Sequence, residues 1–186
     1  DIVIHTRSVA QSNFILDKLK KRLKYFSLEL HPEKTRIVYC PQNKRHHDGD
    51  KDIGVSFDFL GHTFKPRSCE KRTGEIYWGF RAAISDKNKK RILKEIRELN
   101  IHNWVHLGLR ELAKVLRWRI QGWINYYGKF RMSELHRIFR LLNIRLAKWA
   151  RKKYKLKTYS KSYGWLKRMM KWYPETFVHW QYGFTG

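Results

Sequence analysis

The most constraining feature of this sequence is a long helical pattern over residues 107–131, in which apolar and basic positions separate onto two faces. Apolar side chains recur at steps of three and four residues, the spacing of one helix face, at Leu109, Leu112, Leu116, Ile120, Trp123 and Tyr127. Cationic and amide side chains recur at the same spacing at Arg110, Lys114, Arg117, Gln121 and Asn125. At 100° per residue the two rows are centred about 130° apart. The pattern predicts a helix with one core face, and a second face that either binds a partner or is simply solvated.

Charge is distributed unevenly along the chain, whose formal net charge is +25. Residues 1–80 hold 15 Lys and Arg against 10 Asp and Glu, whereas residues 81–186 hold 26 against 6. Charge of that density repels itself unless a polyanion is near, so nucleic acid is the first candidate partner. The basic half also carries most of the aromatic residues, which argues against a disordered basic tail. Cations interleaved with aromatic rings over residues 116–131 suit a polyanion that carries stackable bases.

Several other classes of protein are disfavoured by the sequence. No run of about 18 apolar residues is present, so no membrane span is expected. The start of the chain does not resemble a signal peptide, and Cys40 and Cys69 lack CxxC spacing. We interpret both as reduced thiols of a cytoplasmic protein. These cysteines with His46 and His47 fit no compact zinc finger, so no zinc is expected.

The first part of the chain, residues 1–84, is expected to hold strands and one helix. Because residues 1–6 open directly on a strand pattern, we expect the chain to be a piece of a longer protein. A capping box of Ser8 and Gln11 predicts a helix to about Tyr25, with Val9, Leu16, Leu19, Leu23 and Phe26 inward. Further strands are predicted at residues 35–40, 55–64 and 75–84, the last two as a hairpin. A loop is expected at 41–54 and a turn region at 66–74, and Gly61 indicates a bulge or a close backbone approach.

The second part, residues 85–186, is expected to be an all-helical bundle that begins with Ser85 as N-cap. The expected helices cover 86–99, 107–130, a stretch from a Ser133 cap to about 154, and a short final stretch that Pro174 ends. The inward side chains of the first are Ile92, Ile96 and Leu99, and those of the third are Leu135, Ile138, Leu142, Leu146 and Trp149. Residues 152–161 are expected to form a basic linker. For Trp118, Tyr126 and Phe130 a core position is favoured over base stacking. The fold class is therefore α+β.

Several blocks of the sequence resemble, in the same order, the C-terminal half of bacterial group II intron reverse transcriptases, which are also maturases. LELHPEKTRIV at 28–38 resembles the stretch after the catalytic turn, and FDFLGHTFKPR at 57–67 resembles the end of the palm. GWINYYGKF at 122–130, KWARKKY at 148–154 and FVHWQYG at 177–183 resemble the maturase-specific thumb domain. The resemblance covers essentially the whole chain. It implies the end of a palm over residues 1–84 and a thumb, or maturase-specific domain, over residues 85–186.

The resemblance also implies roles for residues of the first part. Asp1 would be the last carboxylate of the family's Tyr-Ala-Asp-Asp turn and a ligand of the Mg²⁺ ions that nucleotidyl transfer requires, the other ligands lying upstream. Lys34 would lie near the nucleotide, although a surface lysine is an equal alternative. The primer-grip turn would consist of Phe59, Leu60, Gly61 and His62, and Lys65 would also contact nucleic acid. A plain hairpin is the alternative there.

In the second part, the resemblance implies contacts with phosphates and 2′-hydroxyls of RNA. They would come from Arg110, Lys114, Arg117, Gln121 and Asn125, and from a second basic surface of Arg137, Arg140, Lys148, Arg151, Lys152 and Lys153. The expected partners are group II intron RNA and a template–primer duplex. The parent would be an RNA-directed DNA polymerase that supports splicing, and this chain alone should not polymerise. The alternatives are a non-enzymatic maturase, a related reverse transcriptase of host defence or repair, and a basic protein of the ribosomal type.

Overall fold

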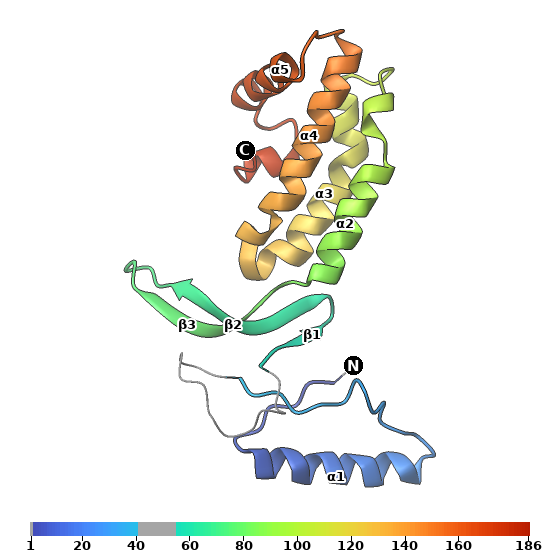
Figure 1. Ribbon diagram of the computed structural model, residues 1–186, viewed down its shortest axis with the longest axis vertical. Coiled ribbons are helices and arrows are strands. Elements are labelled where there is room, and N and C mark those ends of the chain that lie inside the picture. Colours follow the sequence, from blue (N-terminus) through green and yellow to red (C-terminus); the bar gives the residue numbers. More distant parts are fainter. Residues whose placement is uncertain (1, 41–54) are drawn as a thin grey trace. The chain divides into compact units, whose positions relative to one another are not determined.

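The computed structural model describes residues 2–40 and 55–186 (Figure 1). By their internal contacts the residues fall into two compact units, 1–81 and 82–186, which are described separately below. The first contains α1 (Val9–Tyr25), β1 (Phe57–Phe59) and β2 (His62–Glu70). β3 (Ile76–Ile84) begins in the first unit and ends in the second. The α+β class is confirmed.

In the first unit, α1 begins as the sequence predicted. The Ser8 hydroxyl accepts a hydrogen bond from the backbone N–H of Gln11 at 3.2 Å, and the Gln11 side chain accepts one from the Arg7 N–H at 2.8 Å. The helix nevertheless has no buried residue. Its predicted inward face is wrong in this respect: Val9 and Phe26 are exposed, whereas Leu16, Leu19 and Leu23 are half-buried. An apolar row is buried only where another element covers it, and such cover is not encoded in the row itself.

Two predicted strands of the first unit are wrong. Residues 2–6 form no strand, and Ile2 is 81% exposed; residues 35–40 contain only an isolated bridge at Val38. A strand needs a neighbour to satisfy its backbone N–H and C=O groups. In the described residues the sheet has the order β1-β2-β3 and includes neither segment. The predicted loop at 41–54 lies outside the described residues.

The strand predicted at 55–64 is in fact a tight hairpin. β1 and β2 are antiparallel, with Phe59 opposite His62 and Phe57 opposite Phe64, so Leu60 and Gly61 alone form the turn. Both turn residues have positive φ, 45° and 79°, as two-residue turns between twisted strands require. The strand therefore reverses at Gly61, and β2 then continues through the predicted turn region to Glu70. Its predicted pairing with β3 is confirmed.

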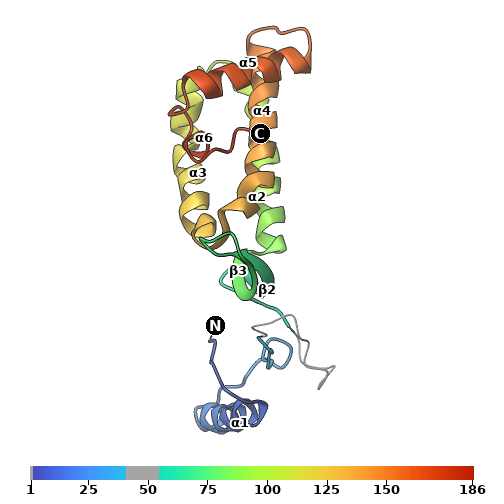
Figure 2. The same cartoon turned by 90° about the vertical axis from the view of Figure 1, so that its left-hand side faces the viewer.

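The second unit is a helical bundle built on α2 (Asp86–Glu98), α3 (Leu109–Arg131) and α4 (His136–Lys153). α2 and α5 (Tyr159–Trp172) both contact α4, and α6 (Val178–Gln181) contacts α3. Figures 1 and 2 show the long helices running alongside one another. Two short 3₁₀ helices, η1 (Ile101–Asn103) and η2 (Met132–Leu135), connect the long helices. The predicted bundle is confirmed, and its helices differ from the prediction mainly at their ends.

The core of the bundle contains the apolar rows that the sequence predicted. Its members from α2, α3 and α4 include Ile92, Ile96, Leu112, Leu116, Ile120, Ile138, Leu142, Leu146 and Trp149, each at most 1% exposed. Ile84 at the end of β3 joins the same cluster. The fully buried indole of Trp149 donates its Nε1–H to the carbonyl oxygen of Trp104 at 3.0 Å, so its polar atom is satisfied.

Of four predicted helix boundaries, two are confirmed and two are wrong. Ser85 caps α2, because its hydroxyl accepts from the Asn88 N–H at 3.3 Å, and α5 ends just before Pro174. Ser133 does not cap α4: it lies inside η2, and α4 starts after Leu135. The basic linker is shorter than expected, because α5 starts after Thr158, whose hydroxyl accepts from the Lys161 N–H at 3.2 Å.

Candidate nucleic-acid interface

The predicted basic row lies on the solvent side of α3. Arg110, Lys114, Arg117 and Asn125 are exposed, whereas Leu112, Leu116 and Ile120 on the core side are at most 1% exposed. Gln121 is half-buried and donates from Nε2 to Asn125 Oδ1 at 2.7 Å. The row is therefore held on a helix whose other side is fixed in the core, so its donors keep a constant spacing along the axis.

The second predicted surface lies on α4, where Arg137, Arg140, Lys148 and Arg151 expose their side chains or line a cavity. Lys152 donates from Nζ to Asn103 Oδ1 at 3.0 Å, and Lys153 to the carbonyl oxygen of Val105 at 2.8 Å. These partners are neutral, so they orient the ammonium groups without cancelling their charge. Residues 135–174 contain 13 Lys and Arg and no Asp or Glu.

An open cavity of about 620 Å³ lies where α4 ends and the connection to α5 begins. It is lined by His102, Lys148, Arg151, Lys152, Lys155, Leu156 and Tyr159. Four of these side chains are cationic and none is acidic. Cations near a helix C-terminus are stabilised by its partial negative charge, and the cavity is wide enough for a phosphate group. Sequence reasoning missed His102, Lys155, Leu156 and Tyr159; the available signal was the long stretch without any acidic residue.

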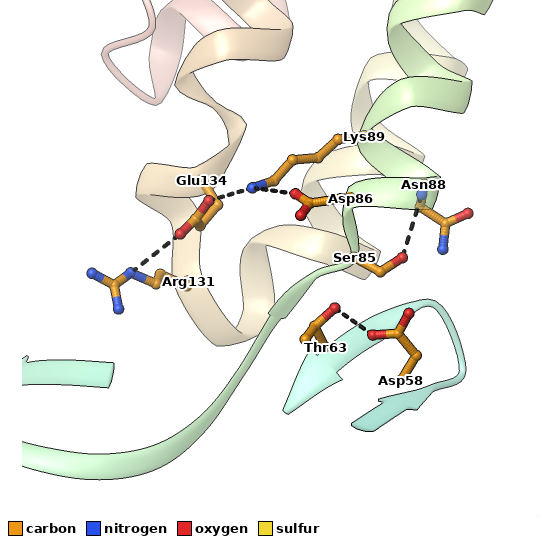
Figure 3. A network of polar contacts seen from close by, with 8 residues as sticks. All are labelled: Asp58, Thr63, Ser85, Asp86, Asn88, Lys89, Arg131 and Glu134. Carbon is orange, nitrogen blue, oxygen red and sulfur yellow. Dashed lines mark hydrogen bonds and ion pairs between the residues drawn. The ribbon is translucent and has the colours of Figure 1, made fainter. Parts of the chain in front are cut away.

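The carboxylates of the helical unit are mostly engaged elsewhere. Figure 3 shows Lys89 of α2 between Asp86, at 3.7 Å, and Glu134 of η2, at 2.5 Å, with Arg131 at 3.9 Å from Glu134. Glu95 pairs with Arg119 and Glu98 with Lys94, and Glu111 accepts the Gly108 N–H. Within the described residues, none of the predicted site cations forms an ion pair with a carboxylate. These cations are Lys34, Lys65, Arg110, Lys114, Arg117, Arg137, Arg140, Lys148 and Arg151.

The preferred core position for three aromatic residues of α3 is wrong. Trp118, Tyr126 and Phe130 are 80%, 50% and 55% exposed. Trp118 lies two residues from both Leu116 and Ile120, which directs it away from the core face of a helix. Tyr127 is only 5% exposed, and its hydroxyl accepts a hydrogen bond from Arg91 at 3.2 Å. The helix thus presents aromatic rings as well as cations to solvent.

Among the described residues of the first unit, the candidates lie on the β1–β2 hairpin, apart from Lys34. Leu60 is 60% exposed at the tip, and His62 is buried, with its Nδ1 donating to the Leu60 carbonyl oxygen at 3.1 Å. Phe59 and Gly61 are half-buried, and Lys65 is exposed on β2. Lys34 is exposed in a turn whose backbone N–H bonds to the carbonyl oxygen of His31 at 3.2 Å. The hairpin fixes the turn residues, and their contact with a primer stays a prediction.

The predicted metal chemistry is not supported by a ligand set among the described residues. Across 2–40 and 55–186 no three His, Cys, Asp or Glu side chains lie together as a metal site. Asp1, His46 and His47 fall outside those ranges, so their predicted roles stay predictions. Cys40 and Cys69 form no disulfide. Among the described helices, none is long and apolar enough to cross a membrane.

Comparison with known proteins places the helical unit in a family. The model of the group II intron maturase-specific domain matches residues 89–172, from the first turn of α2 to the last residue of α5. Neither a curated protein nor a solved structure matches the chain. The matched segment contains the core rows of α2, α3 and α4 and both basic surfaces. Residues 89–172 are therefore a group II intron maturase-specific domain, as the resemblance predicted.

Proposed function

We propose that the helical unit binds group II intron RNA and supports its splicing. The observation that carries the proposal is a set of exposed cations on α3 and α4, within a maturase-specific domain, that pair with no carboxylate among the described residues. They are Arg110, Lys114, Arg117, Arg137, Arg140, Lys148 and Arg151. Arg110, Lys114 and Arg117 would contact phosphates, and Gln121 and Asn125 would reach 2′-hydroxyls. Contacts of these kinds hold a helix on folded RNA by its shape rather than by its base sequence. Arg137, Arg140, Lys148 and Arg151 would extend the same interaction over α4.

The salt dependence of RNA affinity tests this proposal. Each phosphate contact releases condensed counterions, so replacing Arg110, Lys114 and Arg117 together by Gln should lower the slope of log affinity against log salt by about 2 to 3 units. The melting temperature should change little, because exposed charges contribute little to stability. The measurement is fluorescence anisotropy with a structured intron RNA from about 50 to 300 mM salt.

A matched control separates specific contacts from the loss of net charge. Lys87, Lys90 and Arg97 are exposed on α2 and belong to neither basic surface. Replacing these three by Gln removes the same charge, and the slope should stay close to that of the original protein. An unchanged slope in the α3 variant would show that this row is only solvated. An equal decrease of the salt slope in both variants would show that RNA affinity depends on net charge alone.

We propose further that the chain works as the C-terminal part of an RNA-directed DNA polymerase in the cytoplasm. The support is the ordered resemblance of residues 28–38 and 57–67 to palm blocks, and the two-residue turn of exposed Leu60 and half-buried Gly61 where a primer-grip turn is expected. That turn and Lys65 would hold the template–primer duplex. Mg²⁺ supplies charge neutralisation in nucleotidyl transfer, but the described residues do not provide its ligands, and Asp1 would be one of several.

Primer extension tests this second proposal. The 186-residue chain should extend no primer, whereas a longer gene product that includes upstream fingers and palm should extend one and lose the activity on Asp1→Ala. If the longer product binds intron RNA but never extends a primer, the protein is instead a non-enzymatic maturase. Extension by the 186-residue chain alone would contradict the assignment of its missing parts.

A further inference from the structure

A row of apolar side chains on α3 faces solvent beside the basic row. It consists of Val115, Trp118, Tyr126 and Phe130, which are 48%, 80%, 50% and 55% exposed, and it is called the aromatic row below. Trp118 and Tyr126 are eight residues apart, so they share a helix face, and Gly122 lies midway between them. At about 1.5 Å per residue, the two aromatic positions are about 12 Å apart along the axis.

The exposure of Trp118 carries the most weight in this row, because tryptophan side chains are highly buried on average and this one is 80% exposed. In the same bundle the rings of Phe139 and Trp149 are both 0% exposed, whereas Trp172 on α5 is 59% exposed. A contiguous exposed apolar surface with a polar rim is typical of an interaction site. Cations lie next to this row and within it: by helical spacing Lys114 and Arg117 border it beside Trp118, whereas Arg119 and Lys129 fall among its members.

Gly122 gives an independent indication that something outside the bundle approaches this face. Glycine is among the least favourable residues in the middle of a helix, so its presence needs a reason. At Gly128 the reason is internal, because an added Cβ would lie 2.8 Å from the side chain of Met132. At Gly122 an added Cβ would meet nothing within 4 Å. The glycine therefore leaves an open notch between Trp118 and Tyr126 that packing within the described chain does not require.

We propose that the aromatic row stacks unpaired bases of RNA, with a base or ribose entering the notch over Gly122. This inference rests on the proposed RNA-binding function and names the class of RNA segment that α3 recognises. Aromatic rings stack with any base, whereas paired bases inside a helix keep their faces covered. The neighbouring Lys114 and Arg117 would hold the phosphates of the same strand. A second copy of the chain is a poor occupant, since residues 81–186 hold 26 Lys and Arg against 6 Asp and Glu and would repel each other.

The first test compares two RNA probes of equal length and charge, a hairpin with a large unpaired loop and a blunt duplex, on the full chain. Trp118→Ala should weaken loop binding by about 5- to 100-fold, the loss of one or two stacked bases. Duplex binding and the salt slope should stay unchanged, because no phosphate contact is removed. Trp172→Ala on α5 is the matched control: Trp172 is 59% exposed, and its loss should change neither affinity.

The second test fills the notch. Gly122→Leu should weaken loop binding several-fold while the melting temperature holds or rises, because leucine favours a helix more than glycine does. Gly164→Leu is the control, since Gly164 lies in α5 and an added Cβ there also meets nothing within 4 Å. It should leave loop binding unchanged. A loss of binding with retained thermal stability cannot come from unfolding.

Three results would overturn the inference. One is an equal loss of loop and duplex binding on Trp118→Ala, and another is loop binding that survives both Trp118→Ala and Gly122→Leu. The third is a change of oligomeric state on Trp118→Ala without any change in RNA affinity, which would make the row a protein interface. The proposed function fails separately: it falls if the original chain binds neither probe, or if the triple Gln variant keeps the full salt slope.

Discussion

At the scale of single residues, the buried amide of Asn143 in α4 holds the C-terminal segment. Its Oδ1 accepts from His179 Nε2 at 2.9 Å and from Trp180 Nε1 at 3.1 Å, and its Nδ2 donates to the Phe184 carbonyl oxygen at 2.9 Å. Because a carbonyl oxygen only accepts, His179 must carry its proton on Nε2. His179 Nδ1 is buried and has no hydrogen-bond partner among the described residues. The folded protein therefore holds His179 neutral.

The neutral state of His179 predicts a specific loss of stability in acid. Burial lowers the pKa of His179 to about 3, whereas an unfolded histidine titrates near pH 6.5. Between these values the unfolded chain binds a proton that the folded chain does not. Stability is therefore fully present above about pH 6.5 and falls by about 1.4 kcal/mol per pH unit below it.

Urea unfolding at several pH values between 7 and 5 measures this effect. His179→Gln keeps an amide donor for Asn143 but cannot titrate, so the free energy of unfolding should fall less steeply in this variant, by about 1 to 2 kcal/mol over the range. His106→Gln, at an exposed histidine of the same unit, should keep the original pH dependence. Identical slopes for His179→Gln and the original protein would assign the acid sensitivity to other groups.

At the scale of elements, two serines that look equivalent in the sequence differ in the structure. Ser85 caps α2 with a hydrogen bond to the Asn88 N–H and is 2% exposed, whereas Ser133 is exposed inside η2. Ser85→Ala should lower the free energy of unfolding by about 1 kcal/mol or slightly more, the usual value of an N-cap. Ser133→Ala should stay within about 0.5 kcal/mol of the original protein. Denaturant unfolding of both variants makes the comparison, and equal losses would restore Ser133 as a cap.

The same contrast explains what could be predicted from the sequence. Leu112, Leu116 and Ile120 were assigned correctly to the core because a helix repeats every 3.6 residues, a property of local sequence. Strand periodicity alone predicts one strand over 55–64, because leucine rarely adopts positive φ and only Gly61 signals a break. The resemblance, by contrast, implied a turn from Phe59 to His62, with a plain hairpin as the alternative, and the chain does turn there. The strand expected at residues 1–6 does not form over the described residues 2–6, because strand pairing depends on distant partners. The core position predicted for Trp118 is wrong, because its spacing of two residues from both Leu116 and Ile120 directs it outward whatever its hydrophobicity.

The candidate site was predictable to a similar degree. The exposed positions of Arg110, Lys114 and Arg117 followed from the helix period alone. The cavity around Lys148 and Lys155 could not be derived in this way, because it depends on how η1 and the α4–α5 connection meet. Gly122 begins the motif GWINYYGKF, but its open surroundings follow only from the structure, in which an added Cβ would meet nothing within 4 Å. Local periodicity thus predicts which faces are exposed, whereas cavities and notches require the packed structure.

At the scale of the whole molecule, the second unit holds both most of the excess positive charge and the apolar core. The boundary between the two units lies between Arg81 and Ala82, and the residues of the apolar core cluster all lie between Ile84 and Phe184 in the sequence. By contrast, α1 in the first unit has no buried residue. A domain with its own core can fold alone, and exposed cations dominate non-specific affinity for nucleic acid. A fragment of residues 82–186 should therefore fold independently and carry most of the RNA affinity.

Thermal unfolding and RNA titration of two fragments, 82–186 and 1–81, test this prediction. The helical fragment should show a cooperative melt by circular dichroism and bind structured RNA within a few-fold of the full chain at equal salt. The fragment 1–81 should bind far more weakly, because residues 1–80 carry 15 Lys and Arg against 10 Asp and Glu. Leu116→Ala in the helical fragment should remove about 2 to 5 kcal/mol of stability through a core cavity without altering the salt slope of the folded protein. An unfolded helical fragment would show that its core needs the first unit, and equal RNA binding by both fragments would contradict the assignment of the RNA interface to the bundle.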